Sequence, residues 1–182
     1  MRKSLSLAFA ALLAGGLAVV AELQSGLSKG DFVAAFDVLD CSGPSKGDTL
    51  CYRCKYGNRP VVSIFTRELT PEVTQLTKAV DEAVGKNADA KMAGFVVLLT
   101  DDAKSAAGKL EEAASKNAIK NVPLTAYGDK VGPKAYKISD KADVTVMMWV
   151  DSEVKVSKGF NKGDLNKAAI DKLLADTKQI LE

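Results

Sequence analysis

The feature that most limits the fold is an alternation of short apolar runs with segments of helical periodicity. Residues 61–65 (VVSIF) and 95–99 (FVVLL) are β-branched and aromatic runs of the kind that lie in the middle of a sheet. Between them, residues 70–85 begin with the triplet TPE and repeat apolar side chains at helical spacing. A strand, a helix and a strand in this order require a parallel crossover, so the sequence predicts an α/β core.

The rest of the chain completes this core with further strands and helices. Strands are expected at residues 36–39, 122–127, 144–150 and 154–160, and helices at residues 102–115 and 164–181. The short spacing between the last two strands suits a hairpin and adds antiparallel pairing. We therefore expect a three-layer α/β sandwich, with a mixed central sheet, helices on both faces, and a C-terminal hairpin followed by a helix.

The first 21 residues have the features of a cleavable export signal. Arg2 and Lys3 form a basic start, residues 5–20 are largely apolar, and Val19 and Ala21 are small residues before a cleavage point. The alternative is a retained anchor, but an apolar run of about 16 residues is short for the roughly 20 that a span needs. We expect an exported protein, periplasmic or extracellular, with no membrane contact after cleavage.

Domain organisation follows from what remains after the signal. Residues 22–31 are polar and are predicted to be a linker, and residues 32–182 have the length of a single domain. Without Arg2 and Lys3, 23 basic residues balance 23 acidic ones, and no basic stripe with interleaved aromatics indicates nucleic-acid binding. No phosphate-loop or dinucleotide pattern is present, so no cofactor is expected. The oligomeric state is left open.

The absence of histidine and the presence of three cysteines narrow the possible chemistry. A chain without histidine has no Ser-His-Asp or Cys-His nucleophile pair and no imidazole metal ligand. The cysteines are Cys41, Cys51 and Cys54. The last two form a C-x-x-C, whose spacing lets both sulfurs meet in a small ring and act as a dithiol couple. Nearby Lys55 and Arg59 create a positive field that favours a thiolate.

The spacing leaves several arrangements of these cysteines open. Cys51 and Cys54 could form a labile couple that Cys41 resolves by exchange. Alternatively, Cys41 and Cys51 could face each other across a nine-residue turn as a structural disulfide, worth roughly 2 to 3 kcal/mol, with Cys54 free. Three thiolates with Asp40 or Asp48 could hold zinc, but a structural zinc site usually has a second C-x-x-C-like pair or histidines, so no metal is expected.

Three segments, in this order along the chain, resemble a known family. Residues 36–65 are similar to the opening of the peroxiredoxins, a hairpin with a Gly-rich turn and then a loop of the form G-[KR]-P-V-V. Residues 122–138 (VPLTAYGDKVGPKAYKI) resemble the family's F-P-L-x-x-D segment, and residues 144–160 resemble its closing hairpin. From about residue 36 to residue 181 the chain thus resembles the thioredoxin superfamily, in its AhpC/TSA-type peroxiredoxin and thiol-peroxidase branch.

The resemblance does not extend to the usual active site. The family's reactive cysteine lies at the start of the helix that follows the strand matched by residues 61–65, and Thr70 stands there as a predicted helix cap. Asp143 occupies the place of the thioredoxin cis-proline. Peroxidase activity of the usual kind is therefore not expected. The C-x-x-C precedes the strand, so it should lie at its other end, about 17 Å from the family's site.

Two functions remain from the sequence. The first is an exported thioredoxin-like protein that exchanges disulfides with another exported thiol protein, through Cys51 and Cys54 with Cys41 as an auxiliary thiol. By the resemblance, Cys51 would be the attacking thiol, because the first cysteine of such a pair is usually the exposed one. The second is a noncatalytic binding or scaffold domain of the same fold, with a structural disulfide.

Overall fold

The structure, a computed structural model, describes residues 23–182. The export signal expected over residues 1–21 lies outside the described residues. Among the described residues, no helix has both the length and the apolar character needed to cross a membrane.

A mixed sheet of seven strands forms the centre of the molecule. Its strands are β1 (Val38–Asp40), β2 (Thr49–Leu50), β3 (Val61–Thr66), β4 (Ala93–Leu99), β5 (Leu124–Tyr127), β6 (Val144–Val150) and β7 (Glu153–Phe160). They lie in the order β2-β1-β5-β4-β3-β6-β7. The pairs β3–β4 and β4–β5 are parallel and all others are antiparallel, which confirms the predicted parallel core with antiparallel edges.

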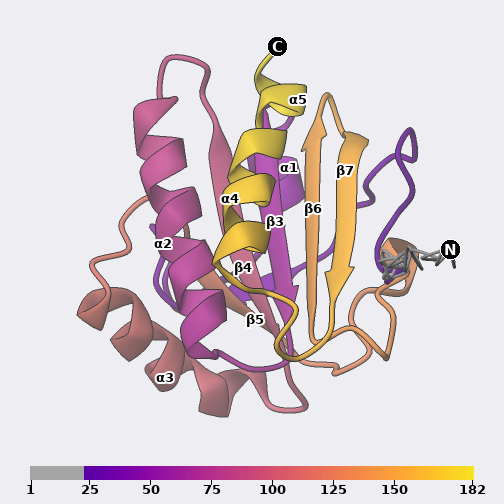
Figure 1. The fold of residues 1–182 in the computed structure, drawn as a ribbon. Coiled ribbons are helices and arrows are strands. Elements are labelled where there is room, and N and C mark those ends of the chain that lie inside the picture. Colours follow the sequence, from indigo (N-terminus) through magenta and orange to yellow (C-terminus); the bar gives the residue numbers. More distant parts are fainter. Residues whose placement is uncertain (1–22) are drawn as a thin grey trace, which may run out of the picture.

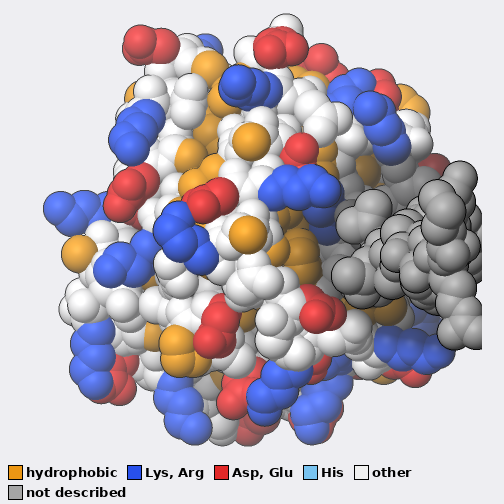
Figure 2. Space-filling model, in the orientation of Figure 1, with side chains coloured by type: hydrophobic (Ala, Val, Ile, Leu, Met, Phe, Trp, Pro, Cys, Tyr) orange, Lys and Arg blue, Asp and Glu red, His pale blue; other side chains and the backbone are white. Residues whose placement is uncertain are grey.

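Helices cover both faces of this sheet. They are α1 (Tyr52–Tyr56), α2 (Pro71–Lys86), α3 (Ala103–Lys116), the 3-10 turn η1 (Lys134–Tyr136), α4 (Lys167–Asp176) and α5 (Lys178–Leu181). Helices α2 and α4 lie in front of the sheet in Figure 1, and α3 and α5 share their core, whereas α1 and η1 pack in the other core. Basic and acidic side chains are interspersed over the front face (Figure 2). The three-layer sandwich is confirmed.

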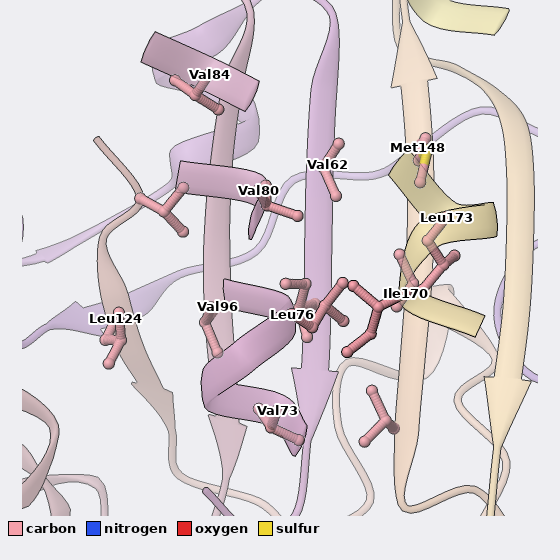
Figure 3. Packing of buried hydrophobic residues seen from close by; sticks show 14 of the residues in the cluster. Val62, Val73, Leu76, Val80, Val84, Val96, Leu124, Met148, Ile170 and Leu173 are labelled. Atoms are coloured by element: carbon pink, nitrogen blue, oxygen red, sulfur yellow. The ribbon is translucent and has the colours of Figure 1, made fainter. Parts of the chain in front are cut away.

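The side chains of strand β3 alternate between the two faces of the sheet, so they belong to two separate hydrophobic cores. Val62 and Ile64 face the core of α2, α3, α4 and α5, whereas Val61 and Phe65 face the opposite core. Figure 3 shows the first core, in which Leu76 of α2 lies beside Ile170 of α4 in front of strand β3. All four β3 side chains are almost fully buried, as the apolar run predicted.

The helix ends follow the local signals with one exception. Thr70 caps α2 by accepting a hydrogen bond from the N–H of Val73 at 3.3 Å, and Asp102 caps α3 in the same way. The helix expected over residues 164–181 is instead divided into α4 and α5 at Thr177. The Thr177 hydroxyl donates to the carbonyl of Leu174 at 2.6 Å, a local bond that competes with helix continuation.

The segment of residues 23–33 is part of the fold, which corrects the linker predicted over residues 22–31. Leu23 and Phe32 form β-bridges to β7, and Leu27 is buried in the core on that side. The Ser25 hydroxyl is 2.6 Å from the hydroxyl of Thr145 and is buried with it. The polar composition did not predict this, because most of the polar side chains stay exposed while Leu27 and Val33 are buried. The one buried polar side chain of the segment, Ser25, has hydrogen-bond partners, so its burial costs little.

Candidate redox site

Cys51 and Cys54 are joined by a disulfide at the start of helix α1, with their Cα atoms 5.2 Å apart. Cys51 is the N-cap residue of this helix, and its Sγ accepts a hydrogen bond from the backbone N–H of Cys54 at 3.1 Å. Cys51 is half-buried and Cys54 is exposed. The bond is therefore accessible from solvent, and one sulfur has a hydrogen-bond donor that would stabilise its thiolate.

Tyr52, between the two cysteines, anchors α1 to the sheet. Its side chain is 1% exposed, and its ring stacks on Phe95 of β4 with 5.6 Å between centroids. The Tyr52 hydroxyl donates to a carboxylate oxygen of Asp40 at 2.8 Å. Burial, and then this hydrogen bond, raise the pKa of the Tyr52 phenol well above its ordinary value. The residue that separates the sulfurs is thus a neutral, fixed part of the core.

Asp40 also organises the turn between β1 and β2. Its carboxylate accepts hydrogen bonds from the backbone N–H groups of Gly43 at 2.6 Å and Ser45 at 2.8 Å. Gly43 has no room for a side chain, because a Cβ there would lie 2.4 Å from the Tyr52 hydroxyl oxygen. The turn, the buried carboxylate and the tyrosine form one unit, which sequence reasoning missed. An acidic residue shortly before a Gly/Ser/Pro-rich turn was the available signal.

Three basic side chains border the pair. The Arg53 guanidinium donates to the Ser152 hydroxyl at 2.9 Å, at the turn between β6 and β7. Lys55 donates to the Ser45 hydroxyl at 3.3 Å and lies 5.5 Å from the centre of the Tyr52 ring. Lys55 and Arg59 are exposed. The positive field expected around the cysteines is thus made by exposed or half-buried side chains.

Cys41 lies apart from the pair, on the other side of the sheet. It is 2% exposed and belongs to the core of α2 and α3, whereas Tyr52 belongs to the opposite core. Burial, and then the nearby Asp40 carboxylate, raise the pKa of the Cys41 thiol to about 11, so it is protonated at neutral pH. The possible disulfide between Cys41 and Cys51 is therefore corrected to Cys51–Cys54, with Cys41 free.

The strand register explains why Cys41 and Cys51 do not pair. Val38 lies opposite Leu50 and Leu39 opposite Thr49, so Cys51 falls four residues away from the position facing Cys41. The three thiols are also not gathered into a metal site. Within residues 23–182, no group of three or more Cys, Asp or Glu side chains is arranged to hold a metal ion.

The position of the family's reactive cysteine lies at the carboxyl end of β3, where α2 begins. Thr70 and Asp143 line a cavity of about 40 Å³ there, beyond the carboxyl end of the strand. Arg67, which follows β3 directly, donates to the carbonyls of Ala142 at 3.0 Å and Ser139 at 3.1 Å. Helix α1 instead precedes β3 in the chain and contacts the β6–β7 turn. The C-x-x-C therefore lies on an element ahead of β3, whereas Thr70 lies at the start of the helix that follows β3.

The fold of this chain is similar to those of several known proteins. No family model matches the chain, and no curated protein matches its sequence. AhpC of Mycobacterium tuberculosis has a TM-score of 0.67 at 12% identity, over 86% of this chain and 99% of that chain. A candidate protein disulfide isomerase from Bacteroides thetaiotaomicron gives 0.65 at 12% identity, over 87% of this chain and 94% of that chain.

A third similar structure is a candidate thiol:disulfide interchange protein DsbE from Chlorobium tepidum. Its TM-score is 0.60 at 18% identity, over 83% of this chain and 99% of that chain. Structures this similar in shape and this distant in sequence define a fold, whereas activity depends on the residues of the site. The chain has a thioredoxin-like fold, as the sequence predicted, with its C-x-x-C on α1 rather than at the start of α2.

Proposed function

We propose that this protein is an exported thiol-disulfide exchange protein that uses Cys51 and Cys54. The observation that carries the proposal is the accessible Cys51–Cys54 disulfide, whose Cys51 sulfur accepts a hydrogen bond from the N–H of Cys54. That hydrogen bond stabilises a thiolate at Cys51, which makes Cys51 the attacking or leaving sulfur. The names of the candidate isomerase and the candidate interchange protein support the same chemistry on this fold.

The exchange needs only the two cysteines and a partner disulfide. In the reduced protein the Cys51 thiolate attacks one sulfur of the partner, which forms a mixed disulfide and releases the other sulfur as a thiolate. Cys54 then gives up its proton and attacks Cys51, which releases the second partner thiol and restores the disulfide. Two electrons pass from protein to partner, and the two thiol protons end on the released thiols. Buried Cys41 takes no part.

The redox midpoint of the pair tests this proposal. We expect a midpoint above about −270 mV in glutathione buffers, as for labile exchange disulfides. The redox state of Cys51 and Cys54 would be read by alkylation and peptide mass mapping, with Cys54→Ser as the control that abolishes the transition. If the Cys51/Cys54 pair had a midpoint below about −300 mV and the protein did not reduce a test protein disulfide, the exchange function would be contradicted.

The export part of the proposal rests on residues 1–21 of the sequence. The partner would then be another exported thiol protein, since disulfides persist in oxidising compartments. Cell fractionation with N-terminal sequencing tests this: the exported form should begin at Glu22. A protein that stays in the cytosol with its first residues intact would contradict it.

The second candidate is a noncatalytic binding or scaffold domain with a structural disulfide. The observation in its favour is Thr70, a helix cap where the family has its reactive cysteine. A Cys51–Cys54 bond that glutathione cannot reduce in the folded protein would select this candidate. A bond that glutathione reduces readily would argue against the scaffold function, because structural disulfides typically resist reduction by glutathione.

A further inference from the structure

The exposed disulfide is bordered by basic side chains that form no direct ion pair within the described part of the chain. Arg53, Lys55 and Arg59 all lie on α1 or in the turn that follows it. None of the three forms an ion pair with a carboxylate of residues 23–182. The polar contacts of Arg53 and Lys55 are with neutral hydroxyl groups instead.

The helices on the front face have both paired and unpaired lysines. Lys86 of α2 pairs with Glu82, Lys116 of α3 with Glu112, and Lys167 of α4 with Asp171, each four residues away on its own helix. Figure 2 shows the resulting mixture of positive and negative side chains over that face. Other lysines of these helices, such as Lys78 of α2 and Lys172 of α4, form no ion pair with the described residues either. What distinguishes Lys55 and Arg59 is their position on α1 and in the turn after it, beside the disulfide, where an approaching partner would meet them.

We propose that the Cys51–Cys54 pair exchanges preferentially with a protein whose reactive cysteine is flanked by Asp or Glu side chains. The inference rests on the proposed exchange function and specifies its partner. In the mixed disulfide, the residues beside the partner's cysteine come next to Lys55 and Arg59, within the distance over which exposed charges interact at low salt. Attraction between these groups raises the rate of encounter and also offsets the repulsion between an anionic partner and the Cys51 thiolate.

Matched peptide disulfides test this charge selection. Three hexapeptides would each contain one cysteine flanked by two Glu, two Gln or two Lys residues, and each would be used as its symmetric disulfide. One equivalent of peptide disulfide and the reduced Cys51/Cys54 pair give the protein disulfide and two peptide thiols. Rates would be followed by acid quenching, alkylation and mass mapping, which separates Cys51 and Cys54 from Cys41.

The wild-type protein should oxidise about tenfold faster with the Glu peptide than with the Lys peptide in about 10 mM salt, and this ratio should approach one in about 1 M salt. In the double variant Lys55→Glu, Arg59→Glu the order of the two peptides should reverse. The Gln peptide should react with both proteins within about twofold. Each comparison of the two proteins uses the same peptide, so intrinsic differences in peptide reactivity cancel.

Lys109→Glu is the matched control, since Lys109 is an exposed residue of α3 on the opposite face of the sheet. It should leave all three rates unchanged. The salt dependence of the wild-type protein provides a test that needs no variant to fold. Equal rates with the three peptides at low salt would overturn the charge selection and leave the exchange function standing. Failure to react with any peptide, the neutral one included, would overturn the exchange function itself.

Discussion

At the scale of residues, Asp40 and Tyr52 determine where the redox pair is held. The sequence singled out Asp40 only as a possible zinc ligand, and nothing in it indicated that Tyr52 is a buried anchor. Their hydrogen bond depends on β1 pairing with β2, and a two-residue strand has no periodicity from which a register could be predicted. The cysteine pairing was undetermined for the same reason, although the spacing did identify the correct pair as one possibility.

Replacing Tyr52 by phenylalanine tests the anchor. The Tyr52→Phe variant removes one donor from the buried Asp40 carboxylate, so the free energy of unfolding should fall by about 1 to 3 kcal/mol. Tyr56→Phe is the matched control, because the Tyr56 hydroxyl donates to a neutral carbonyl, that of Gly94, at 3.2 Å. Its loss should be smaller, about 1 kcal/mol. Urea denaturation of both oxidised variants measures the difference, and equal losses would argue against the anchor.

The buried thiol of Cys41 predicts a loss of stability in alkali. Its pKa is raised from 9.0 to about 11 in the folded chain, so the folded state holds this proton more tightly than the unfolded state does. This contribution to stability is complete below about pH 9 and is lost as the pH rises to about 11. The expected loss is about 2 kcal/mol.

The variant Cys41→Ala isolates this effect. Its free energy of unfolding should be lower at pH 7, because a cavity replaces the thiol. Between pH 9 and pH 11 it should decline less steeply than that of the wild-type protein. The buried tyrosines titrate in both proteins, so they cancel in the comparison. Parallel pH profiles would show that Cys41 ionises normally.

At the scale of elements, the strands and helices with a clear local sequence pattern were predicted correctly. Strand β3 and helix α2 followed from an apolar run, a cap and a helical repeat, and all three are present in the structure. Helix α1 was not predicted, since a helix of five residues has no amphipathic repeat and depends on its contacts with the sheet. The division between α4 and α5 was also missed, because the apolar stripe continues through Thr177 while the backbone does not.

The start of helix α2 could still stabilise a thiolate at position 70, although a threonine stands there. Replacing Thr70 by alanine should cost about 1 kcal/mol of stability through loss of the cap. Thr70→Cys should give a thiol with a pKa below the ordinary value, because the first N–H groups of a 16-residue helix stabilise a thiolate.

The pH dependence of iodoacetamide alkylation in the oxidised protein measures the pKa of the new thiol. Thr74→Cys, one turn further along the same helix, is the control and should have an ordinary or raised pKa. If both cysteines titrated alike, the start of α2 would have no special influence on a thiol.

At the scale of the whole molecule, the order of elements predicted the three-layer α/β sandwich, and the resemblance of three segments to the peroxiredoxins predicted that the fold is thioredoxin-like. Alternating strands and helices allow few topologies, and the observed sheet has the predicted parallel centre and antiparallel hairpin. The linker prediction was wrong, because residues 23–33 cover β7 and part of the adjacent core. Burial of a polar segment depends on a surface assembled from distant residues, so composition alone cannot reveal it.

The contribution of this N-terminal segment can be measured with two substitutions. Leu27→Ala removes a side chain that is 5% exposed, so it should lower the free energy of unfolding by about 2 to 4 kcal/mol. Phe32→Ala is the control within the same segment, because Phe32 is 69% exposed, and its effect should stay within about 0.5 kcal/mol. Thermal or urea unfolding would detect the difference. If Leu27→Ala were as harmless as Phe32→Ala, the segment would be acting as a linker after all.

The hydrogen bond between Tyr52 and Asp40 has a kinetic consequence for a cycling disulfide. Because Tyr52 is held by the sheet and by a carboxylate rather than by the sulfurs, opening the Cys51–Cys54 bond leaves the attachment of α1 in place. The oxidised and reduced chains should then share almost the same backbone. Little structural reorganisation would accompany each two-electron transfer, and the speed of the cycle would be set by sulfur chemistry and partner encounter rather than by refolding of the helix.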